Sequence, residues 1–271
     1  MNQKNKIEER AKALWGEDLH KDKTISPHSL QLEEVFQEEW IESLHGSLLE
    51  IGCGSGADLE IFAANDAFED ITAIDLGDNI LSLAQKYNDR LDITVEKGNA
   101  MSLNFKDNKF NIIYSFGIFH HTSDPIKCIV EARRVLKEGG KIFLYLYSSH
   151  EDSVFKRGGV VIEKIIMKIF KFLPYSIQNL SCVILSPLCW TIFSLPATII
   201  RFFGFKSFST KIPFYFGRHP FSLIGDLKDR LLSPINHRFT KFEMEKIFLS
   251  LNFSDFEVIK TSSGLYIYAE K

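Results

Sequence analysis

The 271-residue chain has only four cysteines, at positions 53, 128, 182 and 189, and none of them forms a CxxC pair. No group of Cys and His residues has the spacing of a zinc site, so we predict no metal. A strong charge of one sign is also missing, because the net charge is −3 and the isoelectric point is near 6.3. This balance excludes a protein that binds nucleic acid over its whole surface, and we expect reduced thiols in a cytoplasmic protein.

The first ten residues, MNQKNKIEER, lack the apolar stretch of a signal peptide. Apolar residues make up 45% of the chain, which is enough for a full core. We expect a helical cap over residues 1–46, an α/β core over 47–150, an apolar and basic helical insertion over 151–235, and a closing helix and hairpin over 236–271.

Strand and helix signals alternate from residue 47 to 147. We expect strands over 47–51, 71–75, 93–98, 110–116 and 141–147, and helices over 57–64 and 78–87. A third helix is expected from Pro125, with Asp124 as its N-cap, to the glycine pair Gly139–Gly140. A capping box of Thr240 and Glu243 predicts a helix to about residue 251, and strands over 256–260 and 265–270 predict an antiparallel hairpin. The alternation predicts an α/β fold with a parallel sheet covered on both faces.

A glycine cluster follows the first predicted strand, in the run EIGCGSG over residues 50–56. Glycines at a strand-to-helix turn let the backbone approach a ligand closely, and the free N–H groups of the helix attract an anion. Asp75 ends the second strand, where it is placed to accept hydrogen bonds from ribose hydroxyls. Gly52, Gly54 and Ala57 also satisfy the dinucleotide fingerprint, so an NAD(P)-dependent oxidoreductase stays open at this point.

Five ordered segments, LLEIGCGSG, AIDL, KGNAMSLNF, FNIIYSFGIFHHTSDP and RVLKEGGKIFLY, resemble the class I S-adenosylmethionine-dependent methyltransferases. The resemblance covers residues 47–147 and returns at 240–271. It implies a Rossmann-like seven-stranded sheet that is mostly parallel with a reversed C-terminal strand, helices on both faces, and here an α-helical lid insertion. It also implies an enzyme that moves a methyl group from S-adenosyl-L-methionine to a small-molecule or lipid-linked acceptor by in-line displacement.

The resemblance implies cofactor-binding positions near the ends of the first four strands: Glu50, Gly52, Cys53, Gly54, Gly56, Asp75, Leu76, Asn99, Ala100, Met101, Ser115 and Phe116. By the same resemblance, Glu50 would help to hold the amino group of the cofactor, and Asp75 would bind the ribose. Asn99 would lie near the adenine amino group. Many family members carry Asp at this position, but the amide oxygen of Asn is still an acceptor.

Two histidines, His120 and His121, follow the fourth strand, where the resemblance places the reaction centre. An imidazole accepts a proton near neutral pH, so either ring is a candidate catalytic base. The alternative is that both are loop histidines that shape the pocket. His237 lies just before the last helix, either as a pocket residue or as an ordinary polar residue at an element boundary.

The insertion departs from the minimal family pattern. Residues 153–220 hold nine basic residues and one acidic residue, Glu163, together with ten of the 24 phenylalanines. No charge occurs from Phe172 to Ile200, but Pro174, Pro187 and Pro196 predict two or three short helices. Three alternatives stay open: a lid that touches a membrane surface through residues 155–216, a soluble lid, and a membrane span. The oligomeric state is open too, as is a non-catalytic cofactor-binding or membrane-docking module.

Overall fold

The computed structural model of the protein describes residues 44–151, 154–261 and 263–271. The helical cap expected over residues 1–46 therefore lies almost entirely outside the described residues. The chain divides into two compact units. Of the described residues, the first unit, the sheet unit, holds those up to Ser148 and from His237 onward, and the second, the helical unit, holds those from Ser149 to Asn236.

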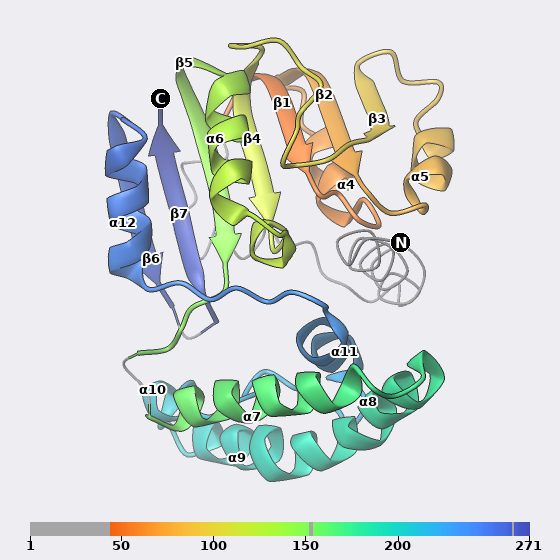
Figure 1. Ribbon diagram of the computed structural model, residues 1–271, viewed down its shortest axis with the longest axis vertical. Coiled ribbons are helices and arrows are strands. Elements are labelled where there is room, and N and C mark those ends of the chain that lie inside the picture. Colours follow the sequence, from red (N-terminus) through yellow and green to blue (C-terminus); the bar gives the residue numbers. More distant parts are fainter. Residues whose placement is uncertain (1–43, 152–153, 262) are drawn as a thin grey trace. The chain divides into compact units, whose positions relative to one another are not determined.

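In the described part of the sheet unit, seven strands form one sheet in the order β3-β2-β1-β4-β5-β7-β6 (Figure 1). The strands are β1 (Gly46–Ile51), β2 (Phe68–Asp75), β3 (Ile93–Lys97), β4 (Phe110–Phe116), β5 (Leu136–Leu146), β6 (Asp255–Lys260) and β7 (Leu265–Glu270). The first five strands pair in parallel, and β7 is antiparallel to both β5 and β6. This order and direction confirm the predicted α/β fold with its reversed C-terminal strand.

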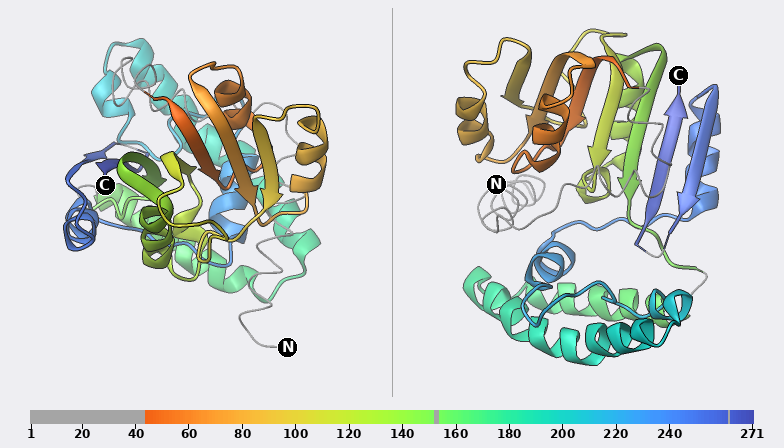
Figure 2. Two further views of the ribbon diagram at one scale, coloured as in Figure 1. Left: turned by 90° about the horizontal axis from the view of Figure 1, so that it is seen from above. Right: turned by 180° about the vertical axis from the view of Figure 1, so that it is seen from behind.

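Helices cover both faces of the sheet because apolar side chains alternate along the strands. On β1, Leu48 packs with α4 (Ala57–Ala63) and α5 (Ile80–Lys86), whereas Leu49 packs with α6 (Pro125–Val135) and α12 (Lys241–Ser250). The two pairs of helices lie on opposite faces of the sheet (Figures 1 and 2). This layering brings the carboxyl ends of the parallel strands to one edge, where ligands of open α/β sheets bind.

Local capping signals place the starts of two helices correctly. The Asp124 side chain accepts from the Lys127 amide at 3.0 Å, and Pro125 is the first residue of α6. Thr240 and Glu243 form the predicted capping box of α12.

The predicted end of the helix at Gly139–Gly140 is wrong. Helix α6 ends at Val135, and Leu136 is already extended and begins β5. The glycine pair lies in an irregular part of β5 between its pairing with β4 at Leu136 and at Lys141. There the Gly139 amide donates to the Lys271 carbonyl and the Lys271 amide donates to the Gly140 carbonyl. Gly139 takes a φ of +70° within this irregular segment, which explains a glycine there without a helix cap.

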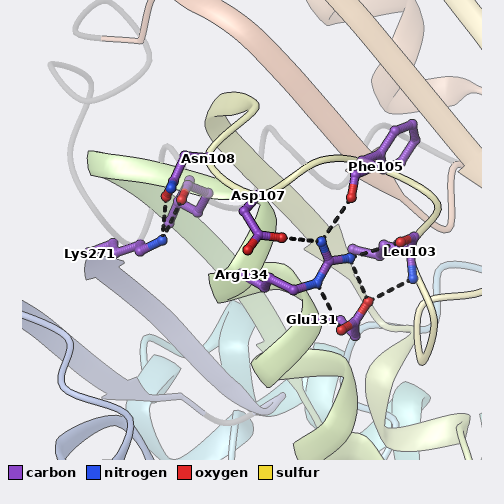
Figure 3. A network of polar contacts seen from close by, with 8 residues as sticks. Leu103, Phe105, Asp107, Asn108, Glu131, Arg134 and Lys271 are labelled. Carbon is purple, nitrogen blue, oxygen red and sulfur yellow. Dashed lines mark hydrogen bonds and ion pairs between the residues drawn. The ribbon is translucent and has the colours of Figure 1, made fainter.

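The connection from β3 to β4 is held by the guanidinium of Arg134 on α6 (Figure 3). Arg134 donates to the carbonyls of Leu103 and Phe105, both at 2.8 Å, and forms ion pairs with Asp107 and Glu131. Glu131 in turn accepts from the Leu103 amide at 2.9 Å. One side chain thus fixes the segment that follows Asn99, a predicted cofactor-binding residue.

The helical unit consists of α7 (Val154–Phe170), α8 (Tyr175–Cys189), the π-helical turn η3 (Trp190–Ser194), α9 (Leu195–Phe202), α10 (Lys206–Ser209) and α11 (Ile224–Leu232). Its core joins Phe170 of α7 and Cys182 of α8 to Leu223, Leu227 and Leu231 at α11.

The prediction that three prolines break the apolar run is wrong for two of them. Pro174 caps the N-terminus of α8, but Pro187 lies inside this helix and Pro196 lies in the first turn of α9. The chain is therefore helical from Tyr175 to Phe202. A wider turn at residues 190–194 follows Pro187, and the Thr191 hydroxyl donates to the Pro187 carbonyl at 2.8 Å.

We expect Arg134→Ala to lower the free energy of unfolding by roughly 2–3 kcal/mol, because it removes charge-assisted hydrogen bonds to two carbonyls and two carboxylates. Urea unfolding followed by circular dichroism measures this loss. The matched control is Arg90→Ala, which removes an exposed ion pair with Asp92 and should leave the midpoint nearly unchanged. Equal midpoints for the two variants would contradict an anchoring role of Arg134.

Candidate active site

The glycine loop between β1 and α4 requires backbone conformations that only glycine adopts easily. Gly52, Gly54 and Gly56 have φ values of +85°, +51° and +81°. A Cβ atom on Gly52 would lie 2.1 Å from a side-chain carbon of Ile118, and one on Gly56 would lie 2.6 Å from Leu83. The loop is therefore fitted closely against its neighbours, and its backbone forms the surface that a ligand would meet.

Asp75, at the end of β2, turns its carboxylate toward this loop. Its Oδ2 accepts from the Gly54 amide at 3.0 Å, and its Oδ1 accepts from the Gly77 amide at 2.7 Å. Each carboxylate oxygen has a second acceptor site, so Asp75 retains capacity for the two hydroxyls of a ribose. Leu76, the next residue, is 36% exposed, which fits a residue that would contact a base.

Sequence reasoning missed Asn79, which holds the same loop from the other side. Its amide nitrogen donates to the Gly54 carbonyl at 2.6 Å, while Oδ1 is buried with no hydrogen-bond partner in the described residues. Gly54 is therefore held through its N–H by Asp75 and through its carbonyl by Asn79. An Asn four positions after the acid that ends the second strand is the signal that could have identified it.

Beneath the loop lies a buried acidic cluster of Glu50, Asp58 and Tyr114. Glu50 on β1 is only 2% exposed, and its Oε2 has no hydrogen-bond partner among the described residues. Burial first, and then the charges of Asp58 and Asp75, raise the pKa of Glu50 well above its usual value. The Tyr114 hydroxyl donates to Asp58 at 3.0 Å, and burial next to this acid raises the pKa of the phenol as well.

An acidic cluster of this kind favours a positively charged ligand group. A cation beside Glu50 would compensate the buried carboxylate and supply the missing hydrogen bond. Cys53 lies in the same surroundings and is not a reactive thiol, because burial and the charge of Glu50 raise its pKa well above its usual value.

The loop after β3 holds the residues expected to lie near a base. The Asn99 side-chain oxygen accepts from the Met101 amide at 2.9 Å, so this oxygen already stabilises the turn. Ala100 is buried, and the Met101 sulfur accepts from the Ser123 hydroxyl. The contact between Asn99 and adenine stays a prediction. Either the amide nitrogen of Asn99 or the remaining lone pair of its oxygen could form it.

At the end of β4, the two predicted residues have different surroundings. Ser115 is buried, and its hydroxyl donates to the Ile51 carbonyl at 2.9 Å, so it joins β4 to β1. Phe116 stacks on Tyr145 with a centroid distance of 4.3 Å and an angle of 7°, and Tyr266 lies edge-on at 6.1 Å. Phe116 therefore belongs to an aromatic wall, whereas the side chain of Ser115 is used within the sheet.

His120 and His121 extend this wall through a short 3-10 turn, Phe119–His121. Both histidines are buried, with ring centroids 4.2 Å apart, and His120 stacks on Tyr147 at 3.9 Å. The His237 amide donates to the His120 carbonyl at 2.8 Å, which connects the approach to α12 with this turn. Burial lowers the pKa of His237, although a hydrogen bond to the Thr122 backbone opposes this shift, so the ring is largely neutral at neutral pH.

These elements form two adjoining regions of the sheet unit, connected through β4. The first is an electronegative glycine loop with an acid at each side, and the second is the aromatic and histidine wall of Phe116, His120, His121, Tyr145, Tyr147 and Tyr266. The residues of the first region fit a ligand that carries both a ribose and a cationic group, as S-adenosylmethionine does.

Comparison with known proteins agrees with this arrangement. Residues 49–144 match the family model described as a methyltransferase domain. The matched range runs from β1 into β5 and includes the glycine loop, Asp75 and both histidines. With the strand order of the sheet, this match shows that the chain carries a class I methyltransferase domain, which implies S-adenosylmethionine as the cofactor.

Two curated relatives are methyltransferases. The chain is 28% identical over 142 residues to the 27-O-demethylrifamycin SV methyltransferase of Amycolatopsis mediterranei, which covers 48% of this chain and 52% of the relative. It is 34% identical over 126 residues to the demethylmenaquinone methyltransferase of Bacillus licheniformis, which covers 45% and 53%. The chain thus spans about half the length of these relatives.

Among solved structures, a SAM-dependent methyltransferase from Aquifex aeolicus matches with a TM-score of 0.48 and 16% identity, over 90% of this chain and 93% of that one. A methyltransferase from Methanococcus maripaludis described as S-adenosyl-L-methionine-dependent matches with a TM-score of 0.47 and 16% identity, over 98% and 91%. The assignment of the fold depends on the strand order and pairing of the chain itself.

We expect Glu50→Gln to stabilise the protein at pH 7 and to weaken binding of S-adenosylhomocysteine. In the wild type the folded state retains the proton of Glu50 above the pH at which the unfolded chain loses it. The free energy of unfolding of the wild type therefore falls as the pH rises above about 4.5, the ordinary pKa of a Glu side chain. Glutamine removes this dependence, so the two proteins should differ at pH 7 and nearly coincide at pH 4.

Urea unfolding at both pH values and calorimetric titration check this prediction. The control is Glu69→Gln, at an exposed position of β2, which should change neither quantity. Equal stability of wild type and Glu50→Gln at pH 7 would contradict the prediction, because it would mean that the buried Glu50 carboxyl does not lower the free energy of unfolding.

Proposed function

We propose that the protein is an S-adenosylmethionine-dependent methyltransferase that acts on a small-molecule or lipid-linked acceptor. The observation that carries this proposal is the pair of acids around the glycine loop. Asp75 faces the loop and is bonded to its backbone, and Glu50 lies buried with one oxygen unpartnered in the described chain. A nucleoside with a cationic amino acid group matches both acids.

The same acids argue against the oxidoreductase alternative. A nicotinamide dinucleotide would bring its negatively charged pyrophosphate to the glycine loop. Here the charges of Asp58 and Asp75 already raise the pKa of Glu50, so the loop lies in a negative local field. Two further phosphate charges would be repelled, whereas a cation is attracted.

The cofactor supplies a sulfonium methyl group that is already activated toward nucleophiles. The chain would then have to bind and orient the two reactants and exclude water. The aromatic wall of Phe116, Tyr145, Tyr147 and Tyr266 offers flat apolar faces for an acceptor with an aromatic or other unsaturated body. The relatives named for demethylmenaquinone and 27-O-demethylrifamycin SV support an acceptor of this kind.

A proton on the acceptor would be taken up by the histidine turn. His121 is the candidate base, because it lies in the buried turn that follows β4, next to the aromatic wall. His120 stacks on Tyr147 and would position its neighbour. The competing role for both rings is to shape the pocket without exchanging protons.

We expect calorimetry to show binding of S-adenosylhomocysteine and none of NADH under the same conditions. Asp75→Asn should lower the affinity for S-adenosylhomocysteine about tenfold or more, because it weakens charge-assisted hydrogen bonds. Asp70→Asn, near the start of the same strand, is the control and should bind like the wild type. Binding of NADH alone would overturn the methyltransferase assignment.

His121→Ala should lower the rate of methyl transfer by roughly 10²-fold or more if the ring is the base, with unchanged affinity for S-adenosylhomocysteine. Transfer of a radiolabelled methyl group to demethylmenaquinol and to simple phenols measures the rate. His219→Ala, at an exposed position of the helical unit, is the control. Unchanged turnover in His121→Ala would leave the ring a structural role only.

A further inference from the structure

The helical unit carries a surface that methyl transfer does not explain. We propose that this unit docks on an anionic lipid bilayer, with α7, α8 and α9 lying flat in the headgroup region and their apolar faces toward the acyl chains. This inference goes beyond the proposed function and does not depend on it. It is argued from the exposure, packing and charge of the described residues of this unit.

The run from Tyr175 to Phe202 has one exposed apolar face. The residues on it recur at helical spacing and are between 46% and 63% exposed: Ile177, Leu180, Ile184, Leu188, Ile192 and Ile199. Phe202 and Phe203 continue this surface at 86% and 69% exposure. The run has a mean hydropathy of 1.9 over its most apolar window, of which only 17% is buried. An apolar surface of this extent is costly in water unless a partner covers it.

The opposite face of the same run is covered by the unit itself. Ser186 donates to the Pro220 carbonyl at 2.7 Å, and Ser194 donates to the Phe214 carbonyl at 2.6 Å. Gln178 is buried and donates to the carbonyls of Phe170 and Leu173. A helix whose polar face is hydrogen-bonded within its own unit is suited to lie on the membrane surface. A helix that spans the bilayer and is surrounded by lipid would have to break these hydrogen bonds.

Helix α7 has the composition of an interfacial helix. Ile162, Ile165 and Ile169 are 53–59% exposed, and Lys164 and Lys168 are exposed along the edge of this stripe. Its buried side is formed by Phe170, which joins the core of the unit. Lysines that flank an exposed apolar stripe reach the headgroups while the stripe enters the apolar layer.

The charge of the unit identifies the kind of partner. Residues 149–236 contain eleven Lys and Arg against five Asp and Glu, whereas the rest of the chain has 21 against 30. An anionic bilayer satisfies both the apolar face and the basic edge. A second copy of the chain would cover the apolar face but would bring two positively charged units together, which disfavours it.

The test is co-sedimentation of the full chain with vesicles, made either of phosphatidylcholine alone or of phosphatidylcholine with an equal amount of phosphatidylglycerol. We expect binding to the anionic vesicles at low salt, little binding to the zwitterionic ones, and release by high salt. The triple variant Lys164→Gln, Lys168→Gln and Lys171→Gln should bind about tenfold or more weakly. Removal of Lys106, Lys109 and Lys127 in the same way takes equal charge from exposed positions of the sheet unit and is the control.

A second variant tests the apolar face. Ile184→Asp should bind the anionic vesicles at least tenfold more weakly, whereas Leu249→Asp, at an equally exposed apolar position of α12, should bind like the wild type. Circular dichroism and S-adenosylhomocysteine binding confirm that each variant is folded. Four outcomes would overturn the proposal. The protein could stay in solution with anionic vesicles at low salt, or bind both vesicle types equally. It could also resist extraction by high salt, as a membrane span would, or prove to be a dimer that Ile184→Asp dissociates.

Discussion

The hydrogen bond from the Gly54 amide to the Asp75 carboxylate is the contact on which the candidate site depends. It joins two residues 21 positions apart, and it forms only because β1 and β2 pair in parallel and end at the same edge. The loop is free to meet the carboxylate because Gly52, Gly54 and Gly56 adopt positive φ values. Asn79 then donates to the Gly54 carbonyl, so the loop backbone is fixed by contacts within the chain itself. Such preorganisation lowers the entropy that binding would otherwise cost.

The acids of this region determine which ligand the loop accepts. A glycine turn followed by a helix attracts anions in most α/β folds, because the helix N-terminus is positive. Glu50 and Asp58 place acidic groups beside this turn, and burial of Glu50 next to Asp58 and Asp75 costs free energy, because it raises the pKa of Glu50. A cation bound beside Glu50 would remove this cost. Groups with such perturbed pKa values are common at ligand-binding sites.

Periodic and local signals made the sheet unit predictable, and contacts between distant residues made the rest unpredictable. Alternating apolar strands and capping motifs at Asp124 and Thr240 act within a few residues, and the structure has each of them. The Tyr114–Asp58 pair depends on strand order, which no local pattern records. Asn79 contacts a carbonyl 25 positions earlier in the chain, and only its spacing from Asp75 hints at this role. The glycine pair at 139–140 was misread because Lys271, far along the chain, pairs with it in an irregular strand. Pro187 was predicted to end a helix, but the chain stays helical past it, with a wider turn at residues 190–194.

The two units have opposite charge, and the chain passes between them twice. One crossing follows Tyr147 at Ser148–Ser149, and the other precedes the bond between His237 and His120 at Asn236–His237. A negatively charged sheet unit is repelled by an anionic bilayer, so the basic helical unit would be the one to make contact. Docking through this unit would hold the enzyme at a surface where apolar acceptors partition. A lipid-linked acceptor, as proposed above, would then meet the enzyme by diffusion in two dimensions, at a higher effective concentration than in water.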